Sequence, residues 1–243
     1  MQNFEFNERA IRPVECVKEA WGLIKDEYWI LFAVSLVGAL IGGISMYVLI
    51  GAMICGIFKT YLNKIDGHRA KFEDLWLGFN YFTPSLLVTV AIFVPVIIWT
   101  VMIMMTLYVP LIAAAIMGPK ADPAAIIGPF AVGLILDLVV GVVMVGLHTL
   151  LIFSFPLIVD RELSAMDSIR LSARAAMKNV GGITGLFLVN IGLVLLGYFA
   201  LCVGVYLVIP IITATHLVAY RKVFPPIENR FFEPPPISAY GGG

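Results

Sequence analysis

The sequence is poor in charged residues and in cysteine, and it has no net charge. Only 13% of its 243 residues are charged, about half the share of roughly a quarter in soluble proteins. Three cysteines make no disulfide framework, and a net charge of +0 does not suit a nucleic-acid binder. The P-loop, Gly-x-Ser-x-Gly, His-Glu-x-x-His and Cys-x-x-Cys patterns are missing from the sequence. These absences argue against a soluble enzyme, a secreted disulfide-rich module and a nucleic-acid-binding protein.

Apolar residues dominate instead. They make up 60% of the chain, and the mean hydropathy is +0.97. Residues 28–58, 75–119 and 179–220 carry no charged side chain, and Asp137 is the one charged residue between 123 and 159. A membrane-spanning helix needs about 20 apolar residues, so each stretch is long enough for at least one. The sequence therefore predicts an all-α, polytopic membrane protein.

Glycine and proline divide these stretches into six predicted spans. The glycine pair in Gly42-Gly43-Ile44-Ser45 separates the first two, and Cys202-Val203-Gly204 separates the last two. Thr83-Pro84 and Gly128-Pro129 are typical of helix starts, and the prolines of 110–128 predict an irregular loop. The predicted spans are about 29–44, 47–62, 84–109, 129–158, 181–201 and 204–221.

The basic residues predict how the chain is oriented. With six spans, all of the 16 lysines and arginines except Lys120 fall on one side of the membrane. An excess of basic residues marks the cytoplasmic side. We therefore expect a multi-pass protein of the plasma membrane, for example a bacterial inner membrane, with both termini in the cytoplasm.

A short amphipathic stretch precedes each pair of spans. This order predicts one membrane domain, 1–222, made of three helix-hairpin units, about 12–63, 71–159 and 162–222, followed by a Pro/Gly-rich cytoplasmic tail, 223–243. The alternative is that any protein built of hairpins would show amphipathic linkers of this kind.

The third amphipathic stretch is the clearest. Ser164 and Asp167 form a capping box at its start. Its predicted apolar stripe is Met166, Ile169, Ala173, Ala176 and Val180. Its cationic face, formed by Arg170, Arg174 and Lys178, is a candidate site for anionic lipid headgroups.

The last third of the chain resembles a known group of proteins. The pattern that carries the resemblance is Phe155-Pro156, Asp160, Ala165, Ser168, Ser172, Asn179, Gly204, Pro210 and Ala219-Tyr220-Arg221. It resembles uncharacterised bacterial integral membrane proteins similar to the membrane domain of glycerophosphoryl diester phosphodiesterase. The resemblance implies a six-helix membrane domain and carries over no catalytic residue.

Three polar residues inside the predicted spans are candidates for function: Asp137, His148 and Asn190. An ionised carboxylate in a span costs roughly 3 kcal/mol, so Asp137 is expected to face the bundle interior or a wet cavity. His148 lies three helical turns further on, on nearly the same face, and Asn190 from the fifth span would join them in a polar track. One alternative is that Asp137 and Asn190 form hydrogen bonds that hold neighbouring helices together. A separate alternative is that His148 is an axial ligand to a haem or pigment.

Other polar residues are expected to have plain structural roles. Asp160-Arg161-Glu162 is interpreted as a solvated turn, and His216 as an anchor at the membrane interface. Cys16, Cys55 and Cys202 are interpreted as small buried hydrophobic residues. The sequence gives no sign of a metal site or of a cofactor.

The function that the sequence favours is not enzymatic. We expect an integral membrane scaffold or an accessory subunit of a larger membrane complex, one that organises lipid. Its partners would be the bilayer and other membrane subunits, not nucleic acid, and its oligomeric state is left open. The alternatives are a small-solute transporter or channel that uses Asp137, and a pigment- or haem-binding subunit that uses His148.

Overall fold

The computed structural model describes residues 6–45, 47–118, 122–199 and 203–226. Within these residues the chain is helical and contains no strand. The elements are α1 (Pro13–Ile24), η1 (Lys25–Glu27), α2 (Tyr28–Ile44), α3 (Ile50–Ile65), η2 (Phe72–Tyr81), α4 (Phe82–Met117), α5 (Pro123–Leu150), α6 (Ser154–Arg161), α7 (Ala165–Lys178), α8 (Val180–Phe199) and α9 (Val203–Val223).

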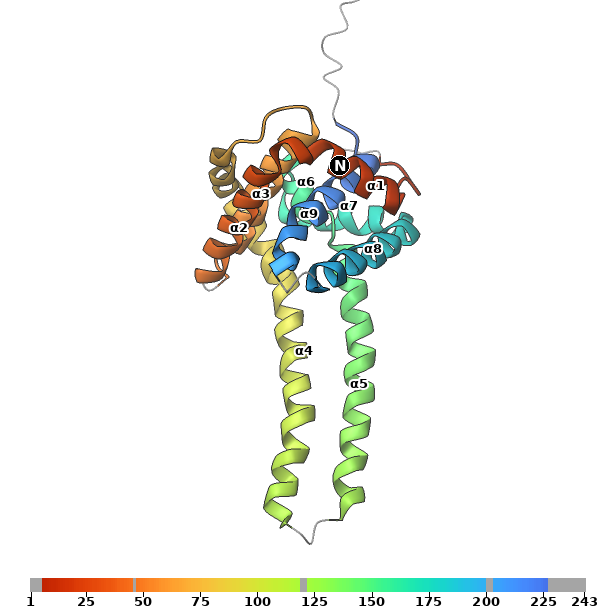
Figure 1. Cartoon of the computed structure of the whole chain (residues 1–243). Coiled ribbons are helices and arrows are strands. Elements are labelled where there is room, and N and C mark those ends of the chain that lie inside the picture. Colours follow the sequence, from red (N-terminus) through yellow and green to blue (C-terminus); the bar gives the residue numbers. More distant parts are fainter. Residues whose placement is uncertain (1–5, 46, 119–121, 200–202, 227–243) are drawn as a thin grey trace, which may run out of the picture.

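The helices form a head from which one long hairpin projects. Figure 1 shows α4 and α5 leaving the head side by side, while the other helices pack together in the head. The 36 residues of α4 rise about 54 Å. Its buried residues, Ser85, Val88 and Thr89, all lie near its start. Most of the hairpin therefore packs only through the contact between its own two helices.

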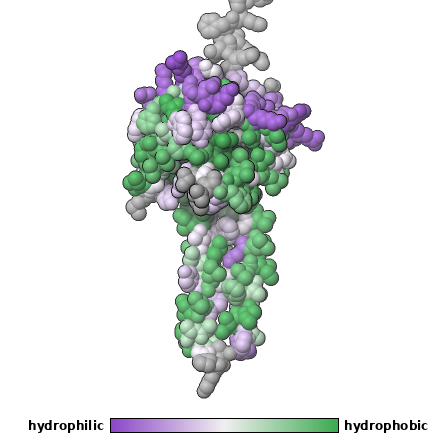
Figure 2. Space-filling model, viewed as in Figure 1, coloured by the Kyte–Doolittle hydropathy of each residue, from purple (hydrophilic) through white to green (hydrophobic). Residues whose placement is uncertain are grey.

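In the part of the chain that the structure describes, five helical segments are long and apolar enough to cross a membrane. They are Pro13–Ile44, Phe72–Met117, Ile126–Arg161, Val180–Phe199 and Gly204–Val223. The prediction of an all-α protein is confirmed, and several helices are long and apolar enough for a multi-pass membrane protein. α3, which corresponds to the second predicted span, is not among the five; it has only 16 residues and carries Lys59 and Lys64. Figure 2 shows the hydrophilic residues gathered at the end of the head that lies away from the hairpin, a surface called here the charged face.

Close backbone contacts and aromatic rings hold the head together. A Cβ added to Gly56 of α3 would lie 2.0 Å from the carbonyl oxygen of Leu75, so only glycine lets η2 approach α3 this closely. On the other side of α3, the rings of Phe153, Tyr220 and Phe224 pack against one another in the core.

The predicted loop over 110–128 is wrong. α4 continues through Pro95 and Pro110 to Met117, and α5 begins at Pro123, where the Asp122 side chain accepts a hydrogen bond from the Ala124 amide at 3.0 Å. In apolar surroundings a continued helix satisfies backbone groups that an irregular loop would leave unpaired, which is why these prolines are tolerated. The start predicted at Gly128-Pro129 is therefore displaced to Pro123, whereas α4 begins at Phe82, within two residues of the start predicted at Thr83-Pro84.

The fourth predicted span, 129–158, is divided in two. α5 ends at Leu150 and α6 begins at Ser154. The Ser172 hydroxyl stabilises the break, because it donates to the Leu150 carbonyl at 2.7 Å and accepts from the Phe153 amide at 3.0 Å. A serine two helices away gives no local signal of this break in the sequence.

The start of α7 is confirmed, and its predicted apolar stripe is buried only in part: Ala176 is buried and Ile169 packs on the core, whereas the two ends of the stripe are exposed. Ser164 caps the helix and accepts from the Asp167 amide at 3.2 Å. Met166 is 56% exposed and Val180 is 50% exposed. The buried residues of α7 are Ala165, Ser168, Leu171, Ser172, Ala175 and Ala176, and all of them except Leu171 are small. Small side chains on this face allow α7 to lie close to its neighbours.

Some predictions fall on residues that the structure leaves undescribed. Cys16 and Cys55 are buried, as expected, whereas Cys202 lies outside the described residues. Lys120 and residues 227–243 of the tail also lie outside them. The division of the chain into three units stays a prediction.

Candidate functional site

Asp137 lies halfway along α5, in the seam with α4. It is 9% exposed, and its Oδ1 has no hydrogen-bond partner among the described residues. The indole of Trp99 on α4 donates to the Asp137 backbone carbonyl at 3.2 Å. A Cβ added to Gly141, one turn further on, would lie 2.8 Å from the same indole ring. The glycine thus makes room for Trp99, which covers this part of the seam.

The structure does not bring His148 and Asn190 to Asp137. The 11 positions between Asp137 and His148 correspond to about 16 Å along α5. The His148 Nδ1 lies 2.8 Å from the Met144 carbonyl oxygen of its own helix. Asn190 lies on α8, which packs on α9 and α1, and its Oδ1 is buried without a partner. The polar track therefore stays a prediction, as does the role of His148 as an axial ligand.

The predicted headgroup residues are accessible. Arg170, Arg174 and Lys178 are exposed on α7. Lys178 forms an exposed ion pair with Glu8 at 3.3 Å, so one of the three cations is partly neutralised by the chain itself. Arg170 and Arg174 are the better placed of the three to meet an anionic headgroup.

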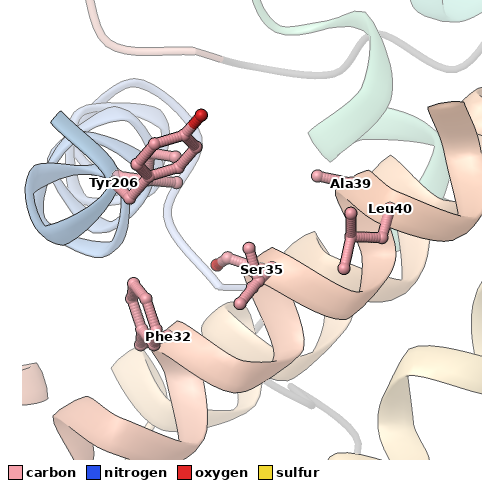
Figure 3. Close-up of a pocket in the computed structure, with 7 residues that line it drawn as sticks. Phe32, Ser35, Ala39, Leu40 and Tyr206 are labelled. Carbon is pink, nitrogen blue, oxygen red and sulfur yellow. The ribbon is translucent and has the colours of Figure 1, made fainter. Parts of the chain in front are cut away.

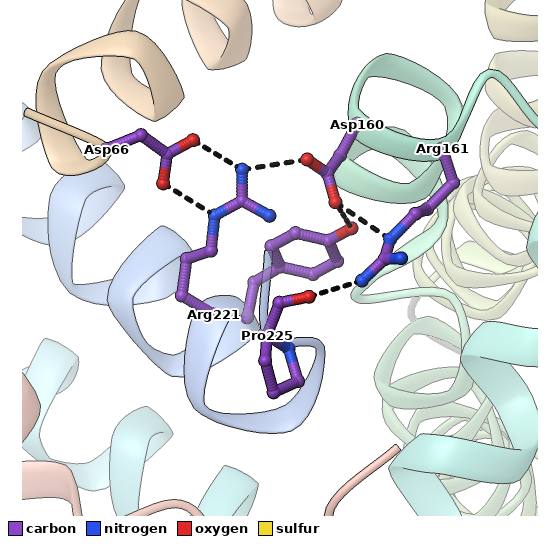
Figure 4. A network of polar contacts seen from close by, with 6 residues as sticks. Asp66, Asp160, Arg161, Arg221 and Pro225 are labelled. Atoms are coloured by element: carbon purple, nitrogen blue, oxygen red, sulfur yellow. Dashed lines mark hydrogen bonds and ion pairs between the residues drawn. The ribbon is translucent and has the colours of Figure 1, made fainter. Parts of the chain in front are cut away.

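An ion-pair network joins three helix ends below the charged face. Figure 4 shows the guanidinium of Arg221, at the end of α9, between Asp66 and Asp160. Its Nε and Nη2 lie 2.9 and 2.6 Å from the two oxygens of Asp66, and Nη2 also lies 2.7 Å from Asp160. Asp66 follows α3, and Asp160 belongs to α6. One side chain thus ties together elements from three distant parts of the sequence.

Asp160 is the centre of this network, so its interpretation as a solvated residue is wrong. Its Oδ2 accepts from the Tyr220 hydroxyl at 2.7 Å and from the Arg161 Nε at 3.0 Å. Its side chain is only 14% exposed. The sequence gives a weak signal for the network, since Tyr220-Arg221 ends one apolar run as Asp160-Arg161 ends another. Nothing local to either pair indicates that the two meet.

Other polar residues fix the packing of the head. The Asn179 side chain accepts from the Ala10 amide at 3.0 Å and donates to the Asn7 carbonyl at 3.2 Å, which holds the N-terminal segment on α7. The ring of His216 is not exposed as an anchor would be: it packs between Phe58 and Phe153, with centroid distances of 5.7 and 6.0 Å. Its Nε2 is buried and has no hydrogen-bond partner in the described part of the chain.

An apolar groove of about 160 Å³ lies between α2 and α9. Figure 3 shows Phe32, Ser35, Ala39 and Leu40 of α2 on one side and Tyr206 of α9 on the other. A dry cavity of similar volume, about 150 Å³, is enough to hold benzene, so a short segment of hydrocarbon would fit. The Ser35 hydroxyl lies 2.8 Å from the Tyr61 hydroxyl, which leaves the groove walls almost entirely apolar.

The described residues contain no group of three or more His, Cys, Asp or Glu side chains placed to hold a metal ion. Comparison of the chain with protein-family models, with curated proteins and with solved structures finds no match. The functional argument therefore rests on the geometry of this chain.

Proposed function

We propose that the protein is a non-enzymatic integral membrane scaffold or accessory subunit that organises lipid and partner subunits. The observation that carries the proposal is the α4–α5 hairpin. Beyond Thr89 none of the described residues of α4 is buried, although the helix continues for 28 positions. A helix pair of this length with apolar outer faces offers a large surface to lipid or to the helices of another protein.

Asp137 supports a role for the hairpin in assembly. Polar groups within spans commonly hydrogen-bond to neighbouring helices, and Asp137 has an unpaired, buried carboxylate oxygen in the hairpin seam. A polar side chain from a partner helix would satisfy it once that helix displaced Trp99 from the seam. Arg170 and Arg174, exposed on α7, then meet anionic headgroups on the cytoplasmic side, the orientation that the basic residues favour.

Co-purification tests this function. The full-length protein is extracted from its native membrane in polymer nanodiscs, and mass spectrometry identifies what accompanies it. We expect a stoichiometric membrane protein with the wild type and a reduced yield of it with Asp137→Asn. Asp122→Asn, at the exposed end of the hairpin, is the matched control and should retain the partner. Recovery of lipid alone with the wild type would contradict the proposal.

The second candidate is a small-solute transporter or channel. The unpaired Oδ1 of Asp137 supports it, because carboxylates inside membrane spans commonly mark ion or proton paths. Proteoliposomes that contain the wild type should then show ion or proton flux, and Asp137→Asn should abolish it. Equal flux with the two proteins, or no flux above that of empty liposomes, would argue against this candidate.

A further inference from the structure

A contact between α2 and α9 conflicts with six crossings. The Tyr28 hydroxyl donates a hydrogen bond to the Leu207 carbonyl oxygen. Tyr28 is the first residue of α2, at the inner surface if α2 crosses, and Leu207 lies near the start of α9, at the outer surface if α9 crosses. Opposite ends of two spanning helices are separated by about 30 Å of hydrocarbon. Hydrogen-bonded partners cannot lie on opposite surfaces, so at least one of the two helices does not cross.

A second contact shows how far α2 and α3 reach along α4. Tyr47, in the turn between α2 and α3, packs against Phe93 of α4 with ring centroids 5.5 Å apart. The 24 positions from Phe93 to Met117 correspond to about 36 Å of helix, which is by itself enough to cross the hydrocarbon layer of about 30 Å. If the turn reached the far surface, this whole length of α4 would stand in water. Leu111 and Ile116 lie on this length of α4 and are 64% and 81% exposed. Because such large apolar side chains would then stand in water, the turn does not reach the far surface.

The position of Lys59 is a third, independent indication that α3 does not cross the bilayer. It lies nine positions after Ile50, the first residue of α3, or about 14 Å from it along the helix. If α3 crossed, the ammonium group would lie near the middle of the bilayer. No ion-pair partner for Lys59 occurs among the described residues. If the turn stays in the near leaflet, Lys59 reaches the headgroups.

The α2–α3 turn is built to end inside hydrocarbon. Its side chains include Ile44 and Val48, which are 82% and 53% exposed. Three of its amides are paired with nearby carbonyl groups: Ser45 N–H donates to Ile41, Tyr47 N–H to Gly42 and Val48 N–H to Ser45, at 3.1–3.2 Å. The Ser45 hydroxyl accepts from the Leu49 amide at 3.2 Å. A turn surrounded by lipid must satisfy its backbone groups in this way.

We propose that only α4 and α5 cross the bilayer, and that the α2–α3 and α8–α9 hairpins turn back within the leaflet next to the charged face. Figure 1 places the end of α2 and the end of α8 near the level at which α4 and α5 leave the head. The acyl chains of that one leaflet cover their apolar surfaces, including Ile44 and Phe199 at the two ends, which are 82% and 88% exposed. The groove between α2 and α9 opens to the same chains.

In this arrangement the protein occupies more area in the near leaflet than in the far leaflet, so its membrane-embedded part has the shape of a wedge. The near leaflet contains the base of the head together with the hairpin, whereas the far leaflet contains α4 and α5 alone. The remaining excess length of α4 is accommodated by tilt, which ranges up to about 40° for membrane helices. The proposal stands on contacts within the chain and does not depend on partner subunits.

Cysteine accessibility tests the proposal. The native cysteines are replaced by alanine, and single cysteines are introduced as Ile44→Cys, Phe199→Cys, Asp122→Cys and Glu15→Cys. The proteins are reconstituted in sealed vesicles and treated with a membrane-impermeant maleimide from either side. We expect Asp122→Cys to react from one side, Glu15→Cys from the other, and Ile44→Cys and Phe199→Cys from neither. All four should react in detergent, which shows that each thiol is chemically competent.

Each other pattern overturns the proposal. Reaction of Ile44→Cys or Phe199→Cys from the side of Asp122 would restore the crossing topology. Reaction from the side of Glu15 would place the ends in water rather than in lipid. Leu40→Cys, on α2, is a second reporter if Ile44→Cys fails to fold, and it should also react from neither side. Co-purification of partners is unaffected by these outcomes, so failure of this topology and failure of the scaffold function are separate results.

Discussion

Arg221 forms a two-point ion pair with Asp66, a residue 155 positions earlier in the chain. The same guanidinium contacts Asp160, so it lies between two carboxylates that would otherwise repel each other. The side chain of Arg221 is only 10% exposed, and this partial removal from water strengthens the electrostatic interaction. The end of α9 is thereby fixed to the ends of α3 and α6.

We predict that Arg221→Met lowers the free energy of unfolding by about 3 kcal/mol, because it leaves two partly buried carboxylates without a counter-charge. Arg12→Ala is the control. Arg12 pairs with Glu15 on the surface, with side chains 75% and 55% exposed, and its loss should cost less than about 1 kcal/mol. Thermal unfolding in detergent micelles measures both. Equal losses would show that the network contributes no more than a surface pair.

Gly56 is predicted to be intolerant of any side chain. Gly56→Ala would bring a methyl group to 2.0 Å from the Leu75 carbonyl oxygen, a backbone atom that cannot move without shifting η2. We expect a loss of stability of about 3 kcal/mol or more. At Gly43, by contrast, an added Cβ meets nothing within 4 Å, so Gly43→Ala should be neutral or stabilising by up to about 1 kcal/mol. A stable Gly56→Ala protein would contradict the close packing of α3 on η2.

Ser172 is predicted to hold the break between α5 and α6. Ser172→Ala leaves the buried Phe153 amide and the Leu150 carbonyl without this partner, at a cost of about 1–3 kcal/mol for an unsatisfied buried group. Ser168→Ala is a matched control, since its hydroxyl donates only to the Ala165 carbonyl one turn away. Its loss should cost less than about 1 kcal/mol in the same unfolding assay.

A wedge-shaped protein is predicted to prefer curved membranes. Labelled protein, reconstituted with its charged face outward, should be enriched on small vesicles relative to large ones, because the wider head occupies the more expanded outer leaflet. Fluorescence per unit of lipid, measured on single vesicles of different diameter, gives the enrichment. A constant protein density over all diameters would show that the head does not expand its leaflet.

The sequence predicts those features that depend on local chemistry. The break after Gly42-Gly43 and the cap at Ser164 follow from glycine flexibility and from a side-chain oxygen at a helix start, and both are present. The length of α4 could not be predicted, because Pro110 signals a turn in water but is tolerated in lipid. Asp137 stands out as a lone acid in an apolar run, and the structure places it in the α4–α5 seam.

The sequence could not predict which distant segments of the chain contact one another. Tyr28 and Leu207 are 179 positions apart, and hydropathy alone places them on opposite sides of the membrane. Hydropathy measures whether a helix suits lipid; it does not tell whether that helix reaches the far surface. The burial of Asp160 could not be predicted for a similar reason, because its partners Tyr220 and Arg221 come from another helix.

The most direct test locates the bilayer on the protein. Cryo-electron microscopy of the protein in a lipid nanodisc, with an antibody fragment bound to the charged face, shows where the midplane of the disc lies. Our account predicts that it crosses the α4–α5 hairpin between Phe93 and Thr106, with the whole head on one side. A midplane that passes through α2 and α3 would contradict it.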